Sequence, residues 1–270
     1  MDLETVSTAS MIGMGVSGLL AIGLPVFLMF YVKFRYKGQI NFFFIGAAMF
    51  VVSAMMLEQL CHAFVFGVTK GTIQNNIWVY ALYAGLAAAV FEETGRLIAI
   101  RYFMNGKKVK MNDVNAFMYG IGHGGAESVL IVGSTCVNNL TTAIMLNSGS
   151  FSDIISSLDD TTKQQTIEGI KQLVEAPSTA FYLAGIERIF AIAMQIAFTV
   201  FIYQAVKHQK KELAVIAYAA HFVVDFITVV ASNFLPMIST ECLIAAMAAA
   251  VGVGAYFVWQ KYDARVREDN

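Results

Sequence analysis

The stretch MIGMGVSGLLAIGLPVFLMFYV, residues 11–32, contains no charged residue. A helix that crosses a bilayer needs about 20 mostly apolar residues. Six further windows have the same apolar character, and with the first they are residues 11–32, 40–66, 77–100, 113–146, 179–206, 213–232 and 235–258. The fourth window is longer than one membrane thickness, and Gly120, Gly122, Gly124 and Gly125 would permit a break in it. The sequence therefore predicts an all-α, multi-pass membrane helix bundle of about seven transmembrane helices.

The composition excludes several classes of protein. The chain of 270 residues is 57% hydrophobic and only 14% charged, whereas a soluble domain is about 25% charged. Disorder requires low hydrophobicity and high net charge, which this chain lacks. A net charge of −1 leaves no broad basic face, so we expect no nucleic-acid partner.

The basic residues predict the orientation of the helices. Lys and Arg gather after the first, third, fifth and seventh windows, as Arg101 and Lys211 illustrate, and the other connections hold few of them. Cytoplasmic loops of membrane proteins carry an excess of Lys and Arg. We therefore expect the N-terminus outside, the C-terminus inside, and one integral domain, residues 1–270, in the cell membrane.

One connection on the predicted outer side is long, at about residues 148–178. Its apolar residues recur at helical spacing, and Thr162 with Gln165 resembles a capping box. The pattern predicts two short amphipathic helices on the extracytoplasmic surface. Such helices would form either a lid over the bundle or a plain surface connection.

Ionisable side chains inside membrane spans are costly and indicate functional sites. Eight charged residues and three histidines lie well inside the windows: Glu58, Glu92, Glu93, Arg96, Glu127, Glu187, Arg188, Asp225, His62, His123 and His221. At about 1.5 Å per residue, Glu92, His123 and His221 lie about 12–15 Å from the inner ends of their spans. These three predict an inner site. Glu58, His62, Glu187 and Arg188 lie nearer the outer face, where we expect a structural charge network.

The spacing of the inner charges predicts three pairs on common helix faces. The members of each pair are four residues apart: Glu92 with Arg96, His123 with Glu127, and His221 with Asp225. Glu93 is rotated from Glu92 by about 100° around the helix. The two glutamates therefore cannot face one point unless the helix is distorted, which Gly95 would allow.

A glutamate beside two histidines can activate water directly or through a metal ion. Glu92 or Glu93 would act as the base, and His123 and His221 would polarise water or stabilise an oxyanion. Alternatively, His123, His221 and a carboxylate would ligate zinc. The same groups would also suit the proton relay of a proton-coupled transporter, although the sequence contains no inverted repeat.

Three motifs carry a resemblance to a known family. The segments FEETGR (residues 91–96), HGGAE (123–127) and HFVVD (221–225) resemble those of the YhfC-type membrane peptidases. That family is similar to the clan of CAAX prenyl proteases, bacteriocin-immunity membrane proteases and PrsW-like proteases. The clan pairs two glutamates with an arginine, and adds an aromatic-x-x-x-His and a His-x-x-x-Asn/Asp motif.

The resemblance implies roles for the matching residues. Glu92 and Glu93 would activate the hydrolytic water, His123 would have Tyr119 as its aromatic partner, and His221 with Asp225 would stabilise the oxyanion or orient water. In the CAAX proteases three residues separate the second glutamate from the arginine. Here the spacing of Glu92 to Arg96 matches that pattern, which favours Glu92 as the base.

We therefore expect an intramembrane endopeptidase that acts on a membrane-associated peptide or protein, with its site in the cytoplasmic half of the bilayer. Clan members have been described both as metalloproteases and as metal-independent glutamic proteases. The resemblance thus predicts a protease without committing the chain to zinc. The proton-coupled transporter is the alternative.

Overall fold

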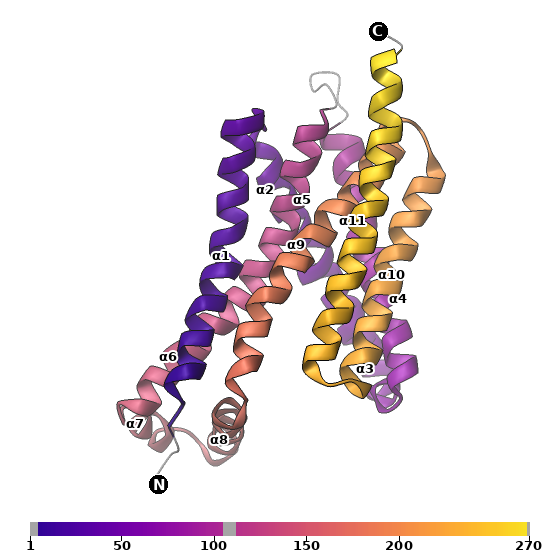
Figure 1. Cartoon of the computed structure of the whole chain (residues 1–270). Coiled ribbons are helices and arrows are strands. Elements are labelled where there is room, and N and C mark those ends of the chain that lie inside the picture. The colour runs from indigo at the N-terminus through magenta and orange to yellow at the C-terminus, as the bar shows by residue number, and fades with distance from the viewer. Residues whose placement is uncertain (1–4, 105–111, 269–270) are drawn as a thin grey trace. The chain divides into compact units, whose positions relative to one another are not determined.

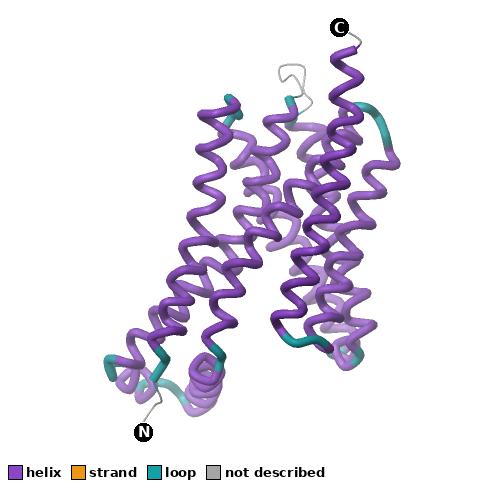
Figure 2. Tube along the Cα trace, viewed as in Figure 1, coloured by secondary structure: helices purple, strands orange, loops and turns teal. Residues whose placement is uncertain are grey.

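The computed structural model describes residues 5–104 and 112–268, and all regular secondary structure in them is helical (Figures 1 and 2). In chain order the helical elements are α1 (Thr8–Tyr36), α2 (Ile40–Phe50), η1 (Val51–Glu58), α3 (Gln59–Thr69), η2 (Thr72–Asn75), α4 (Ile77–Phe103), α5 (Asp113–Glu127), η3 (Ser128–Gly133), α6 (Ser134–Asn147), α7 (Phe151–Ser156), α8 (Asp160–Glu175), α9 (Ser178–Lys207), α10 (Lys211–Phe234) and α11 (Met237–Glu268). The elements η1 and η3 are π-helical, and η2 is a short 3₁₀ helix.

Six helices of the described chain are long and apolar enough to cross a membrane: Thr8–Tyr36, Ile40–Thr69, Asp113–Asn147, Ser178–Lys207, Lys211–Phe234 and Met237–Tyr262. This confirms the prediction of an all-α, multi-pass membrane protein. The helix α4 is also long, with 27 residues, but it carries Glu92, Glu93, Arg96 and Arg101. A seventh span through α4 and the orientation of the helices stay predictions.

The chain forms two compact units. The first consists of Met1–Leu24 and Ser128–Ile189, and the second of Pro25–Glu127 and Phe190–Asn270. The three boundaries fall at a proline inside α1, at the first residue of the π-helical η3, and within α9 after Ile189. The expectation of one integral domain over residues 1–270 stays a prediction.

In the second unit, glycines bring α5 very close to its neighbours. A Cβ on Gly122 would overlap the backbone of Phe43 in α2, and one on Gly120 would lie 2.8 Å from the Cα of Ile196 in α9. Small residues at such contacts let helix backbones approach one another. The break that these glycines would permit does not occur at them. The α-helix continues to Glu127, and the irregular geometry begins at Ser128, after the glycines.

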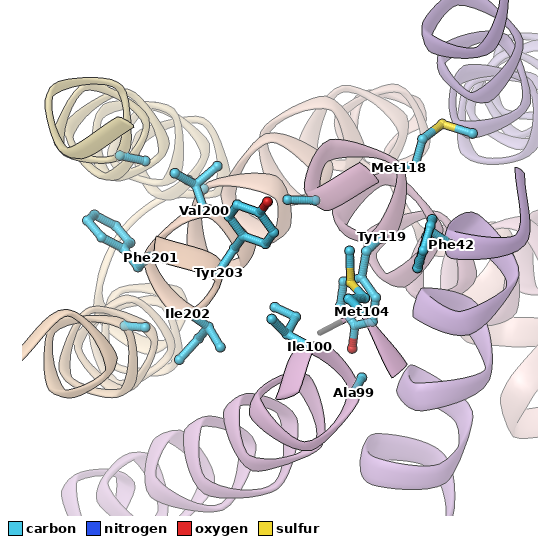
Figure 3. Close-up of a cluster of buried hydrophobic side chains, with 14 of the residues drawn as sticks. Phe42, Ala99, Ile100, Met104, Met118, Tyr119, Val200, Phe201, Ile202 and Tyr203 are labelled. Carbon is cyan, nitrogen blue, oxygen red and sulfur yellow. The ribbon is translucent and has the colours of Figure 1, made fainter. Parts of the chain in front are cut away.

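A buried hydrophobic cluster lies among the same helices (Figure 3). Phe42 of α2, Ile100 of α4, Tyr119 of α5 and Ile202 and Tyr203 of α9 are each at most 1% exposed. The helices α4 and α10 also meet closely, since a Cβ on Gly85 would lie 3.0 Å from the carbonyl oxygen of Phe222. This packing fixes the helices that carry the predicted site residues.

In the first unit, the segment 148–178 contains α7 and α8, whose residues Ile155, Ile170 and Leu173 belong to a buried cluster with Met14 of α1. The capping-box prediction for Thr162 was wrong, because Asp159 is the N-cap of α8 and accepts hydrogen bonds from the amides of Thr161 and Thr162. A carboxylate is among the strongest caps. The extracytoplasmic position of this segment stays a prediction.

Candidate active site

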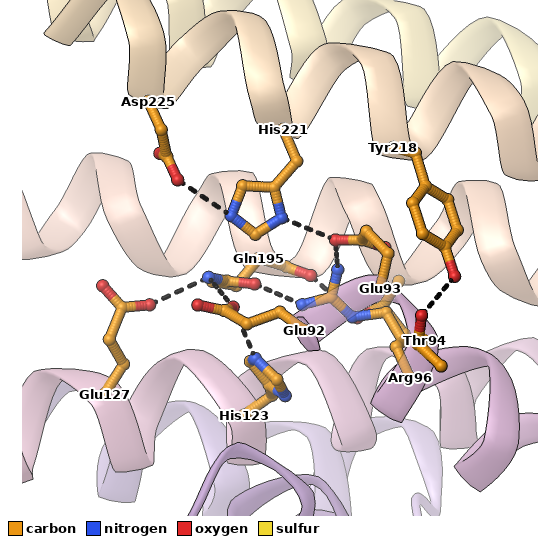
Figure 4. Close-up of polar contacts among 11 residues, drawn as sticks. Glu92, Glu93, Thr94, Arg96, His123, Glu127, Gln195, Tyr218, His221 and Asp225 are labelled. Carbon is orange, nitrogen blue, oxygen red and sulfur yellow. Dashed lines mark hydrogen bonds and ion pairs between the residues drawn. The ribbon is translucent and has the colours of Figure 1, made fainter. Parts of the chain in front are cut away.

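The two adjacent glutamates of α4 reach different histidines (Figure 4). Oε2 of Glu92 lies 2.9 Å from Nε2 of His123 in α5, and Oε1 of Glu93 lies 2.8 Å from Nδ1 of His221 in α10. Successive residues of a helix point about 100° apart. Because α4 is a regular helix through Gly95, no distortion is needed. The structure thus forms two Glu–His pairs from three helices.

Arg96 pairs with Glu93, three residues earlier, and with the side-chain oxygen of Gln195. The predicted pair of Glu92 with Arg96 was therefore wrong. Spacings of three and four both place side chains on one helix face, and the Glu92 carboxylate is turned toward α5 instead. The Arg96 guanidinium is fully buried, so its pairing with a carboxylate is essential.

Gln195 of α9 joins the two Glu–His pairs. Its amide nitrogen Nε2 donates to Oε2 of Glu92 at 3.0 Å and to Oε2 of Glu127 at 2.9 Å, while its Oε1 accepts from Arg96. A continuous polar network therefore runs from one pair to the other, as the dashed lines of Figure 4 show. Sequence reasoning missed this residue, since an uncharged amide in an apolar window gives little signal.

His123 is fully buried between aromatic rings. The ring centroids of Phe50 and Tyr119 lie 5.4 and 6.1 Å from that of His123. Tyr119 is therefore beside the histidine, where the motif placed it, and its hydroxyl has no hydrogen-bond partner in the described chain. The expected pairing of His123 with Glu127 was wrong. Nε2 of His123 faces Glu92, and its Nδ1 is buried without a partner among the described residues.

His221 has a carboxylate on each ring nitrogen. Nδ1 faces Glu93, and Nε2 lies 3.4 Å from Oδ2 of Asp225, the residue four positions later. The ring of Phe198 stacks on the imidazole with 4.6 Å between centroids. The predicted His221–Asp225 pair is therefore present. The Asp225 side chain is 32% exposed, so this contact lies at the edge of the network.

The outer charges include one pair in each unit. In the second unit, Nε2 of His62 lies 3.3 Å from Glu58, and its Nδ1 lies 2.7 Å from the hydroxyl of Tyr83. In the first unit, Arg188 forms an ion pair with Glu187. The expectation that all four charged residues form one structural network stays a prediction.

The donor groups offer no ready metal site. Within residues 5–104 and 112–268, no three His, Cys, Asp or Glu side chains come together in a way that could hold a metal ion. The inward nitrogens of His123 and His221 instead face Glu92 and Glu93. The sequence left open a zinc site of His123, His221 and a carboxylate as an alternative. The described side chains do not assemble that site in this arrangement, and the mechanism below contains no step through a metal.

The family model described as "YhfC intramembrane metalloprotease" matches residues 20–248, which include every residue of the polar network. The chain belongs to the YhfC family. A curated relative, the "Uncharacterized membrane protein YhfC" of Bacillus subtilis (strain 168), is 36% identical over 208 residues, which are 76% of this chain and 78% of that protein. No solved structure matches the chain.

Membership of the YhfC family confirms the resemblance drawn from the three motifs. It identifies the chain as a multi-pass membrane protein of an intramembrane protease family, located in the cell membrane. Three points stay predictions for this chain: its membership of the wider clan, its catalytic type, and the roles of its individual residues.

Proposed function

We propose that this chain hydrolyses a peptide bond of a membrane-associated substrate with a water molecule activated by Glu92. The supporting observation is the buried network in which Gln195 and Arg96 join the Glu92–His123 and Glu93–His221 pairs. The substrate is a peptide or protein in or at the bilayer, and the site opens toward the cytoplasmic half.

The surroundings of the two glutamates favour Glu92 as the base. Glu93 is 0% exposed and is bound to both Arg96 and His221, which hold its carboxylate in place. In the described chain the hydrogen bonds of each glutamate fall on one oxygen, Oε2 of Glu92 and Oε1 of Glu93, and the other oxygen of Glu93 is buried. Glu92 is 7% exposed, so its Oε1 is the oxygen that accepts a proton from water, and Glu93 acts as a positioning residue.

Two side chains orient the base. Nε2 of His123 and the amide of Gln195 both contact Oε2 of Glu92, from different helices. Two contacts from fixed elements restrict the rotation of the carboxylate. A base held in one orientation contributes through proximity, because the reacting atoms need not find the geometry during the reaction.

His221 supplies the oxyanion donor. Its contact with Asp225 is 3.4 Å, longer than the 2.8 Å contact with Glu93, and the Asp225 side chain is partly exposed. When substrate binds, Nε2–H of His221 leaves Asp225 and donates to the developing oxyanion. Nδ1 stays bound to Glu93, which keeps the ring in orientation.

Glu92 both takes and returns the proton that the hydrolysis moves. The water oxygen forms a bond to the carbonyl carbon while Glu92 takes a proton from the water. Collapse of the tetrahedral intermediate breaks the carbon–nitrogen bond, and Glu92 gives its proton to the leaving amine. The products are a carboxylic acid and an amine, so no oxidant or further reactant is needed.

The test is cleavage of a membrane-tethered peptide by the purified full-length chain. Removing a general base lowers the rate by about 10²–10⁴-fold, so Glu92→Gln should abolish most cleavage. Removing an oxyanion donor lowers it by about 10²–10³-fold, which is the loss expected for His221→Ala. Glu212, exposed at the start of α10, provides the control, and Glu212→Gln should cleave as the wild type does.

Unchanged cleavage by Glu92→Gln would refute the proposed base. A second outcome would identify the proton-coupled transporter instead. In that case the wild type cleaves no peptide but carries a proton-coupled flux in liposomes, and Glu92→Gln abolishes this flux.

A further inference from the structure

A cavity of about 610 Å³ lies between the ends of α4 and α9 and the start of α10. Leu97, Val206 and Ala214 provide an apolar wall. Arg101 and Lys211 also line the cavity, and both are exposed. All of these residues belong to the second unit. The cavity therefore combines an apolar surface with two cations.

The charged side chains among the described lining residues of this cavity are all cations. Besides Arg101 and Lys211, the described lining residues include the polar Gln209, and none of these described residues is acidic. Neither Arg101 nor Lys211 takes part in an ion pair within the described part of the chain. Two cations beside an apolar wall complement a ligand with an anionic head and an apolar tail.

We propose that this cavity binds an anionic phospholipid. The phosphate of the headgroup lies between Arg101 and Lys211, and an acyl chain lies along Leu97, Val206 and Ala214. The position of the cavity favours a lipid over a free anion. It lies at the ends of α9 and α10, which are long and apolar enough to cross a membrane, and basic pockets between membrane-spanning helices bind lipid headgroups.

The bound lipid would support the helices that carry the polar network. Arg101 lies five residues after Arg96 on α4, about 8 Å along the axis, so the headgroup is outside the network itself. Gln195 and His221 lie on the other two helices that form the cavity, α9 and α10. A lipid that bridges these helix ends therefore stabilises their relative positions. This inference does not depend on the proposed function.

The experiment measures lipid binding to the full-length chain in a neutral detergent by native mass spectrometry. Phosphatidylglycerol should bind, and phosphatidylcholine should bind at least tenfold more weakly. The double variant Arg101→Gln/Lys211→Gln should lose at least tenfold in affinity for phosphatidylglycerol. Lys210, next to Lys211 but outside the cavity lining, provides the control Lys210→Gln, which should bind as the wild type does.

Two further variants keep the proposal testable if the double variant does not fold. Ala214→Phe fills the cavity without changing its charge and should also lower phosphatidylglycerol affinity at least tenfold. Arg101→Lys keeps the charge and should bind within threefold of the wild type. Wild-type affinity in Ala214→Phe, or in the folded double variant, would overturn the proposal.

Two competitors distinguish the source of the anion. Inorganic phosphate has no acyl chain and should not displace phosphatidylglycerol at equal concentration. A soluble acidic peptide should not displace it either. Displacement by phosphate would show that the apolar wall contributes nothing, and displacement by the peptide would identify a protein ligand. Either result would overturn the assignment to a lipid.

Discussion

Replacing Gln195 by methionine tests whether the two Glu–His pairs work as one network. The substitution keeps the length of the side chain but removes its three hydrogen bonds, to Glu92, Glu127 and Arg96. A hydrogen bond to a charged partner contributes about 1.5–3 kcal/mol. Because only the bond to Glu92 acts on the proposed base, that range sets the expected effect on the reaction.

A loss of about 1.5–3 kcal/mol corresponds to a rate reduction of about 10- to 10²-fold, at 1.36 kcal/mol per tenfold. We expect Gln195→Met to lower kcat by this factor and to change KM little, since Gln195 orients the base without forming the substrate surface. The variant should also unfold more readily, by about 3 kcal/mol, because the buried Arg96 loses an acceptor.

The assay is steady-state cleavage of a membrane-tethered peptide in detergent micelles, with thermal unfolding measured on the same sample. Gln204 provides a matched control, because it lies on the same helix, is 1% exposed and is outside the network. Gln204→Met should cleave as the wild type does. Wild-type kcat in Gln195→Met, or an equal fall of kcat in both variants, would refute the role assigned to Gln195.

Three more predictions concern stability and metal dependence. Arg96→Met leaves the buried Glu93 without the guanidinium that pairs with it, and should lower the free energy of unfolding by about 3–5 kcal/mol. The double variant Glu93→Gln/Arg96→Met should recover at least half of this loss. If it recovers none, the two residues do not act as a buried ion pair. Gly122→Ala should destabilise by about 1–3 kcal/mol because the new methyl group overlaps Phe43, and Gly252→Ala, which meets no atom within 4 Å, should not; thermal unfolding compares the two. A zinc chelator should leave peptide cleavage unchanged, since the histidines face carboxylates. A loss of cleavage that added metal restores would refute this prediction and would show that a metal activates the water together with Glu92.

The membrane fold could be predicted because it depends on long apolar windows, which are local in sequence. The window at residues 77–100, for instance, lies within α4, and that at 179–206 lies within α9. The sites of close packing could not be predicted. Gly122 can equally break a helix or allow another helix to approach, and only its contact with Phe43 decides between them.

The candidate site was predicted as a group of residues but not in its pairing. Glu92 and Glu93 both satisfy helical spacing to Arg96, so the choice depends on histidines far away in the sequence. Gln195 and Gln204 are both uncharged amides in one apolar window. Nothing local distinguishes the amide that contacts Glu92 from the one that does not, because the contact comes from another helix.

The two π-helical segments, Val51–Glu58 and Ser128–Gly133, affect how sequences of this family should be aligned. A π-turn accommodates one residue more than an α-turn, and residues beyond it are displaced by about 100° around the axis. A single-residue gap in either segment is therefore compatible with the same helix on both sides. If an alignment places the gap in a neighbouring α-helix instead, Glu127 or His62 is matched with a residue on a different helix face of the relative. The gap therefore belongs in the π-turn.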